Sequence, residues 1–85
     1  MSRADKLLKR FLSKPRDFTY DELRQLLAGF DYEETSSGRT SGSRVSFVNR
    51  STMHIIKIHR PHPAHELKKY QLDDIEESLR AKGVI

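Results

Sequence analysis

Histidine and arginine are the residues of this sequence whose types and spacing could do chemistry. All four histidines, His54, His59, His62 and His65, lie in segment 35–70, which carries seven basic residues and one acidic residue. Histidine can take up or release a proton near neutral pH, and the planar arginine side chain can hold a phosphate with two hydrogen bonds. The segment therefore indicates an anionic partner, of which nucleic acid is the commonest. A charged face that serves only solubility is equally compatible with these charges.

Length and composition limit the class of protein that could carry this chemistry. The chain has 85 residues, of which 35% are hydrophobic, and this predicts one small domain. It has no cysteine, which excludes disulfides and thiolate metal sites. No apolar run is long enough to span a bilayer, and the charged start of the chain lacks the apolar core of a signal peptide. We therefore expect a cytoplasmic protein with no membrane partner.

Hydrophobic spacing predicts an α+β fold with the element order α-α-β-β-β-α. Apolar residues recur at helical spacing in three segments and alternate with polar residues in the others. The strands should form a three-stranded antiparallel sheet with the helices on one face. The helices are expected over 2–12, 19–29 and 71–82, and the strands over 30–35, 43–48 and 53–59.

The register of the second and third strands decides which side chains share a face. A turn centred on residues 50–51 would place the apolar side chains of both strands on the face that meets the helices. Arg44 would then lie across from Lys57 on the opposite face, with His59 beside Gly42. A slip of one residue would bury Arg44 and Lys57, which is costly. The pattern thus gathers cations and a histidine on the side of the sheet away from the helices.

Four stretches in order carry a family resemblance: residues 23–30, residues 42–47, the segment His-Pro-Ala-His-Glu-Leu-Lys-Lys at 62–69, and residues 72–85. Together they resemble the HicA toxin family, small bacterial RNases of toxin–antitoxin pairs. The resemblance implies the α-β-β-β-α fold of the double-stranded RNA-binding domain over residues 16–85. Residues 1–15 would be an N-terminal helical extension of that domain.

The resemblance also implies an activity and partners. The chain would be the toxin of a type II toxin–antitoxin system, an endoribonuclease that acts on mRNA without a metal or other cofactor. A HicB-type antitoxin would cover its basic face. When free of the antitoxin, the chain would be a monomer or a homodimer.

One position departs from the family pattern. The family usually reads Gly-Ser-His at the start of the middle strand, and that histidine is its catalytic residue, whereas here Arg44 stands in its place. Arginine does not lose its proton under ordinary conditions and is a poor base. We therefore expect His59 to act as the base, His62, which matches the family's second histidine, to act as the acid, and Arg44 to hold the scissile phosphate. The side chains expected to contact RNA are Arg44, Lys57, Arg60, Lys68 and Lys69.

Other interpretations remain open at this point. A non-catalytic RNA-binding module could keep the fold and the basic face after losing the catalytic histidine, and a pure interaction protein could use that face for an acidic protein. Arg44 could instead bridge to Glu33 or Glu34 on the neighbouring strand. The histidines at 59, 62 and 65 have the spacing of metal ligands, but prolines stiffen that loop and no supporting partner is evident. His54 is expected to be half-buried with its hydrogen bonds satisfied, and His65 to be exposed.

Overall fold

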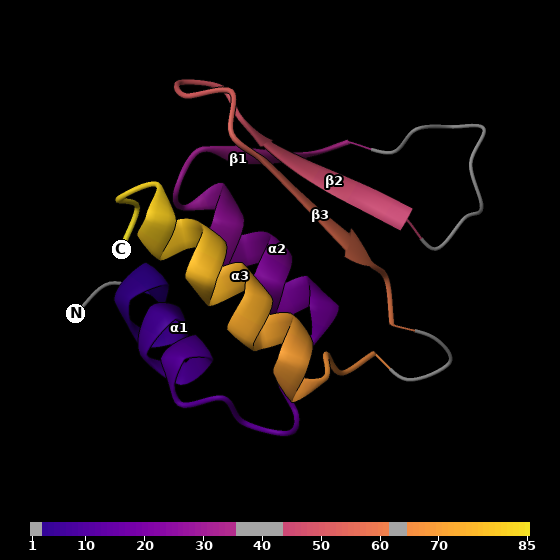
Figure 1. Cartoon of the computed structure of the whole chain (residues 1–85). Helices are drawn as coiled ribbons and strands as arrows, with labels where there is room; N and C mark the ends of the chain where they lie inside the picture. Colours follow the sequence, from indigo (N-terminus) through magenta and orange to yellow (C-terminus); the bar gives the residue numbers. More distant parts are fainter. Residues whose placement is uncertain (1–2, 36–43, 62–64) are drawn as a thin grey trace.

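The computed structural model describes residues 3–35, 44–61 and 65–85, so the expected loop at 36–42 and His62 lie outside the described residues. Its helices and strands follow the predicted order, α-α-β-β-β-α. The three strands form one antiparallel sheet in the order β1-β2-β3, and the helices gather on one side of it (Figure 1). The predicted α+β fold, like that of a double-stranded RNA-binding domain with an added N-terminal helix, is confirmed. The elements are α1 (Arg3–Leu12), α2 (Tyr20–Ala28), β1 (Tyr32–Thr35), β2 (Arg44–Asn49), β3 (Ile55–His59) and α3 (Lys69–Ala81).

Helix α2 begins where the sequence predicts it to begin. The Thr19 side chain accepts a hydrogen bond from the backbone N–H of Glu22 at 3.1 Å, and the Glu22 carboxylate accepts one from the backbone N–H of Thr19 at 3.0 Å. This reciprocal cap satisfies two donors that a helix start leaves unpaired. Gly29 follows the last turn. The helix is therefore fixed at both ends, and its leucines face the core.

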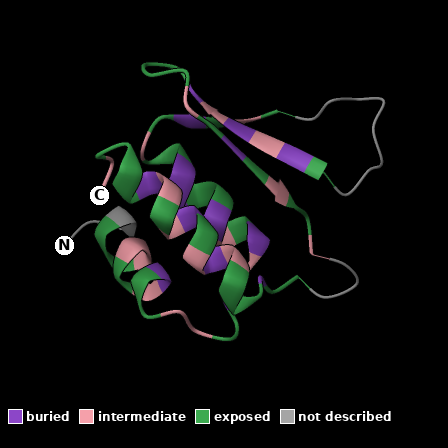
Figure 2. Ribbon diagram, in the orientation of Figure 1, coloured by how far each residue is buried: buried purple, intermediate pink, exposed green. Residues whose placement is uncertain are grey.

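The core lies between the inner face of the sheet and the three helices (Figure 2). Helix α1 contributes to it, because Phe11 is fully buried and its ring lies 5.7 Å from that of Phe18. Arg10 of α1 also donates to the carboxylate of Glu22 at 2.7 Å. The division of the chain at residue 15 stays a prediction, but α1 shares one hydrophobic core with the remainder.

The strand register differs from the prediction by two residues. Arg44 lies opposite His59, and Ser46 opposite Lys57, so the expected pairing of Arg44 with Lys57 is wrong. The connection between the strands spans residues 50–54, and the backbone N–H of Asn49 bonds to the carbonyl of His54 at 2.9 Å. A shift of two residues keeps every side chain on its expected face, because side chains alternate with a period of two. The prediction of the faces is therefore confirmed.

His54 has the surroundings expected of it. The ring is half-buried, and its Nδ1 atom lies 2.6 Å from the hydroxyl oxygen of Tyr32. The two rings meet edge to face. This histidine therefore supports the packing of β1 against the hairpin.

Among the described helices, none is both long enough and apolar enough to cross a membrane. The longest, α3, has 13 residues.

Candidate nucleic-acid interface

The central pair of the candidate site lies on the outer face of the sheet. Arg44 begins β2, His59 ends β3, and the two are direct cross-strand partners. Their neighbours Val45 and Ile58 point to the opposite, helix-covered face, where Val45 is buried and Ile58 half-buried. Side chains directly opposite each other in an antiparallel pair have Cβ atoms about 4.5–5.5 Å apart. The Arg44 guanidinium and the His59 imidazole can therefore reach the same bound group.

Lys57 extends the site along the same face. It precedes His59 by two residues on β3 and is the diagonal neighbour of Arg44, a relation that places Cβ atoms about 7–8 Å apart. All three side chains are exposed. Two cations and an imidazole at this spacing suit a phosphate and a proton transfer beside it.

The two glutamates of β1 are paired with other arginines. Glu33 accepts from Arg50 at 2.7 Å, and Glu34 pairs with Arg60 at 3.7 Å. Within residues 3–35, 44–61 and 65–85, Arg44 forms no ion pair with either glutamate. The interpretation of Arg44 as a bridge to β1 therefore has no support in these contacts, and its guanidinium stays available to a ligand.

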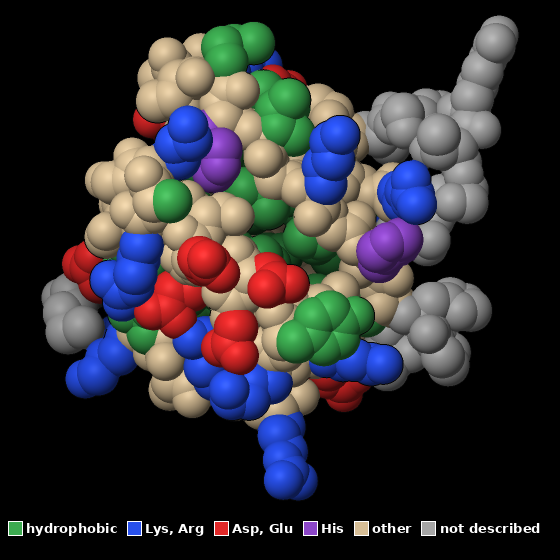
Figure 3. Space-filling model, in the orientation of Figure 1, with side chains coloured by type: hydrophobic (Ala, Val, Ile, Leu, Met, Phe, Trp, Pro, Cys, Tyr) green, Lys and Arg blue, Asp and Glu red, His purple; other side chains and the backbone are tan. Residues whose placement is uncertain are grey.

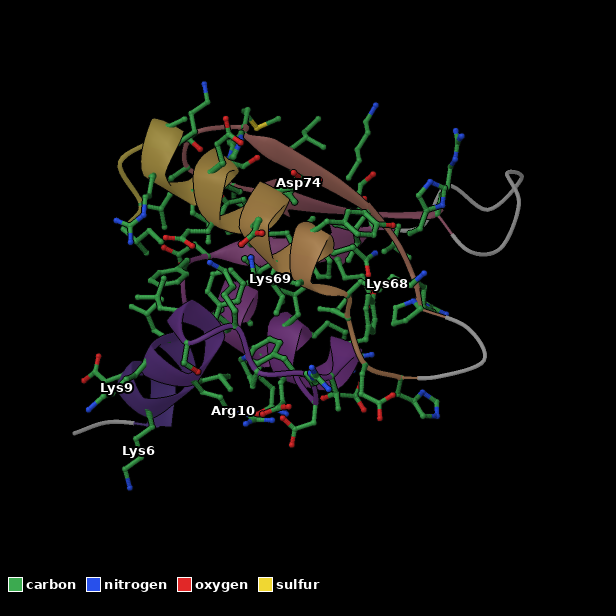
Figure 4. The ribbon with its side chains drawn as sticks, turned by 60° about the horizontal axis from the view of Figure 1, so that its bottom comes forward. Lys6, Lys9, Arg10, Lys68, Lys69 and Asp74 are labelled. Carbon is green, nitrogen blue, oxygen red and sulfur yellow. The ribbon has the colours of Figure 1, made fainter. Side chains whose placement is uncertain are left out.

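A glutamine side chain joins the end of β3 to the start of α3. The amide nitrogen of Gln71 donates to the backbone carbonyl of His59 at 3.0 Å, and its amide oxygen accepts from the backbone N–H of Lys68 at 3.0 Å. Lys68 is exposed and, in the part of the chain that the structure describes, has no ion pair. Figure 4 shows Lys68 at the start of α3, far from Lys6 and Lys9 on α1. Gln71 thus brings a third cation to the end of the sheet that holds the Arg44 and His59 pair.

The Arg60 side chain contacts a carboxylate and an aromatic ring of its own chain. Its guanidinium carbon lies 5.2 Å from the centre of the Tyr20 ring, and its Nη2 atom lies 3.7 Å from Glu34 Oε2. The Tyr20 hydroxyl donates to the same carboxylate, and burial together with this bond raises the pKa of Tyr20 to about 12. This cation therefore contributes to the packing of α2 against the sheet.

Lys69 is likewise paired within the chain. Its Nζ lies 3.1 Å from Asp73 Oδ2, one turn along α3, and hydrogen bonds from Lys69 and Lys14 lower the pKa of Asp73. Of the five side chains expected to contact RNA, Arg44, Lys57 and Lys68 are the ones without an ion pair to another described residue. The role of all five stays a prediction.

The remaining histidines take different places. His62 lies outside the described residues. His65 is exposed as expected, and its backbone carbonyl accepts from Tyr20 at 2.9 Å, which ties the segment before α3 to the start of α2. Over the described ranges, no three histidine, aspartate or glutamate side chains are grouped so as to hold a metal ion.

Gln71 and Tyr70 also belong to this region, although neither was expected from the sequence. The last helix was expected to begin at Gln71, whereas α3 begins at Lys69. Only half of the usual sequence signal was present: Gln71 reaches back to the backbone N–H of Lys68 as in a capping box, but lysine is not a residue that marks the start of a helix. Tyr70 then falls in the first turn of α3, next to Gln71, and is exposed.

Lysine, arginine and histidine side chains gather along the right-hand side of the face shown in Figure 3. The chain was compared with protein families, with curated proteins and with solved structures. A family model described as HicA toxin of bacterial toxin–antitoxin matches residues 20–83, which leaves α1 outside the matched region. No curated protein and no solved structure gives a significant match.

Proposed function

The chain belongs to the HicA toxin family of bacterial toxin–antitoxin systems, and on that basis we propose that it is an endoribonuclease toxin that cleaves mRNA without a metal ion. The observation that carries the proposal is the pairing of Arg44 with His59 on the exposed face of the sheet. An arginine in the place of the family's usual catalytic histidine leaves the site without a base at that position. The cross-strand partner of that arginine is itself a histidine, which can supply one.

The proposed reaction uses the 2′-hydroxyl of the RNA as its nucleophile. His59 takes the proton from this hydroxyl, whose oxygen then attacks the adjacent phosphorus. The bond from phosphorus to the 5′-oxygen breaks, and His62 gives a proton to the departing oxygen. Arg44 and Lys57 stabilise the negative charge that builds up on the phosphorane. The products are a 2′,3′-cyclic phosphate and a free 5′-hydroxyl.

The expected protein partner is a HicB-type antitoxin that covers the same face. Support comes from the outer side of the hairpin, where Ile55 is 49% exposed and Val48 lies opposite it half-buried. Apolar side chains beside cations suit a protein partner that contributes both apolar and acidic groups. Because mRNA is the proposed substrate, we place the activity in the cytoplasm.

The replacement of the family's usual histidine by Arg44 also favours a second candidate, a non-catalytic RNA-binding module. One assay separates the two. Purified protein is incubated with end-labelled mRNA, with and without EDTA, and the fragment ends are tested for cyclic phosphate. Cleavage that survives EDTA and leaves cyclic phosphate ends supports the endoribonuclease. Salt-sensitive binding with no cleavage supports the binding module.

A further inference from the structure

A groove runs along the free edge of the sheet, between β3 and α3. Strand β3 is an outer strand, and the groove beside it has a volume of about 180 Å³. Figure 3 shows a hollow on this face, with a hydrophobic floor and a rim of basic, histidine and acidic side chains. The candidate site therefore adjoins a groove. The proposed phosphate contacts and proton transfers do not use this groove. Its polar and aromatic lining consists of Lys57 and His59 from β3, and of Tyr70, Gln71, Asp74 and Ser78 from α3.

Tyr70 is an aromatic side chain that the fold does not use. It is 60% exposed and is the one aromatic residue among the exposed large hydrophobic side chains of the described ranges. Its hydroxyl has no hydrogen bond to another described residue, in contrast to the hydroxyls of Tyr20 and Tyr32. An exposed aromatic ring beside phosphate-binding cations is the usual platform on which an unpaired RNA base stacks.

Asp74 is a second side chain of the groove that makes no contact needed by the fold of the described residues. It follows Tyr70 by four residues and so lies on the same face of α3. Its neighbour Asp73 pairs with Lys14 and Lys69, whereas Asp74 is exposed and has no ion pair or hydrogen bond to the residues that the structure describes. Figure 4 shows Asp74 on α3, on the side toward the sheet. An unpaired carboxylate repels an RNA backbone, so its place in this groove calls for a group that donates hydrogen bonds to it.

Gln71 links the helix turn that carries Tyr70 to the strand end that carries His59, the proposed general base. It is the neighbour of Tyr70, and its amide bonds directly to the backbone carbonyl of His59. The two walls of the groove are thereby tied together at the end where the Arg44 and His59 pair lies. His59 and Tyr70 line the same groove, so a nucleotide held at His59 can place its nucleobase beside Tyr70.

We propose that Tyr70 and Asp74 form a nucleobase-reading site that selects an unpaired guanine of the bound RNA. The guanine stacks on the Tyr70 ring, and its N1–H and N2–H groups both donate to the Asp74 carboxylate. Adenine and cytosine present a single donor group on this edge with an acceptor beside it, and uracil presents one N–H between two carbonyl oxygens. Guanine is therefore the only one of the four bases that can donate two neighbouring N–H groups to the two oxygens of a carboxylate. The proposal rests on the proposed function, since the RNA must be held by the neighbouring cations.

The size of the groove agrees with this ligand. A volume of about 180 Å³ is well below the roughly 300–1,000 Å³ of sites for drug-sized molecules. It accommodates one planar base, whereas a folded RNA element would have to remain outside. The site would thus set a sequence preference at one position of a single-stranded substrate.

The test measures binding to short RNAs that cannot be cleaved. Decamers with 2′-fluoro groups throughout lack the attacking hydroxyl, and they carry guanine, inosine or adenine at one position in an otherwise uridine sequence. Fluorescence anisotropy at low salt gives the affinity of the full chain for each decamer. We expect guanine to be preferred over adenine by about 10-fold or more, which is the discrimination of a bidentate base contact. Inosine, which lacks the N2 amino group, should fall between them.

Matched variants separate base reading from charge. Asp74→Asn and Glu77→Gln each remove one exposed negative charge from α3, and both should raise RNA affinity slightly. Only Asp74→Asn should abolish the preference for guanine. Tyr70→Ala should weaken binding of all three decamers, whereas Tyr70→Phe should keep both the affinity and the preference.

The possible results distinguish this proposal from the proposed function. A preference for guanine that disappears in Asp74→Asn and persists in Glu77→Gln supports the site, whether or not the natural RNA is cleaved. Equal affinity for the three decamers, or a preference that survives Asp74→Asn, overturns the site even if mRNA is cleaved. Failure to bind any decamer at low salt overturns the site, and the cleavage assay on natural mRNA then decides separately whether the proposed function stands.

Discussion

Among single residues, the cross-strand partners Arg44 and His59 are the two on which the proposed activity depends. Arginine cannot act as a base, and histidine can, so we propose that the cross-strand pair divides phosphate binding and proton transfer between its two side chains. The alternation of side chains along the strands was enough to predict that Arg44 and His59 both lie on the outer face of the sheet. The ion pairs of Arg60 and Lys69 were not predictable, because Glu34 lies far from Arg60 in the sequence and the start of α3 was misplaced.

The phosphate contact can be tested at Arg44. Arg44→Ala should weaken binding of single-stranded RNA by about 10- to 100-fold at low salt, because a charge-assisted contact is worth about 1.5–3 kcal/mol. The dependence of log affinity on log salt should also decrease by about one ion. Fluorescence anisotropy across a salt series measures both quantities.

Arg16→Ala is the matched control for this measurement. Arg16 is also an exposed arginine, but it belongs to the connection between α1 and α2, which lies on the far side of the helices from the sheet (Figure 1). It should change affinity only slightly. If the two variants bind RNA equally, the outer face of the sheet is not the binding surface.

At the scale of elements, the hairpin shows what periodicity can and cannot predict. Alternation along β2 and β3 predicts which side chains face the helices, and a register error of two residues leaves that unchanged. The register itself depends on the connection, where Met53 has a left-handed backbone with a φ of 62°. Such a conformation is unusual for methionine, so no residue type in the turn signalled it. Tyr70 was missed for a related reason, since the boundaries of α3 are set by contacts rather than by its apolar stripe.

Asn49 holds this connection in place. It is buried; its side-chain oxygen accepts from the backbone N–H groups of Ser51 and Thr52, and its amide nitrogen donates to the carbonyl of Phe30 at 3.0 Å. Asn49→Ala should lower the free energy of unfolding by about 2–3 kcal/mol, because it removes three partly buried hydrogen bonds to the backbone. Urea denaturation followed by circular dichroism measures the loss. Ser51→Ala, in the same turn but exposed, should cost little, and equal costs for the two variants would contradict this role.

At the scale of the whole molecule, α1 is joined to the family fold by charge as well as by its core contacts. Arg10 donates to Glu22 of α2, and Lys14, just after α1, pairs with Glu76 of α3. The hydrogen bond from Arg10 is the main cause that lowers the pKa of Glu22, and the one from Lys14 is the main cause that lowers the pKa of Glu76. Residues outside the matched family region thus stabilise the two helices that support the sheet.

These carboxylates predict a loss of stability in acid. Their pKa values are lower in the folded chain than in the unfolded chain, so the unfolded chain binds more protons as the pH falls. The stabilisation is complete above the pKa of the unfolded state and disappears as the pH falls through the lower pKa of the folded state. The melting temperature should therefore be steady near neutral pH and decrease below about pH 5. Lys14→Ala should flatten this decrease, whereas Lys82→Ala should not; identical pH profiles for wild type and Lys14→Ala would contradict the account.

The proposed role of His59 as the base can be tested by comparing two histidine variants in one cleavage assay. His59→Ala and His65→Ala each remove one exposed histidine, but only His59 is the partner of Arg44. We expect the initial rate of mRNA cleavage to fall at least 100-fold in His59→Ala and to stay near the wild-type rate in His65→Ala. Circular dichroism should show that both variants are folded. A folded His59→Ala protein that cleaves mRNA at the wild-type rate would contradict the claim.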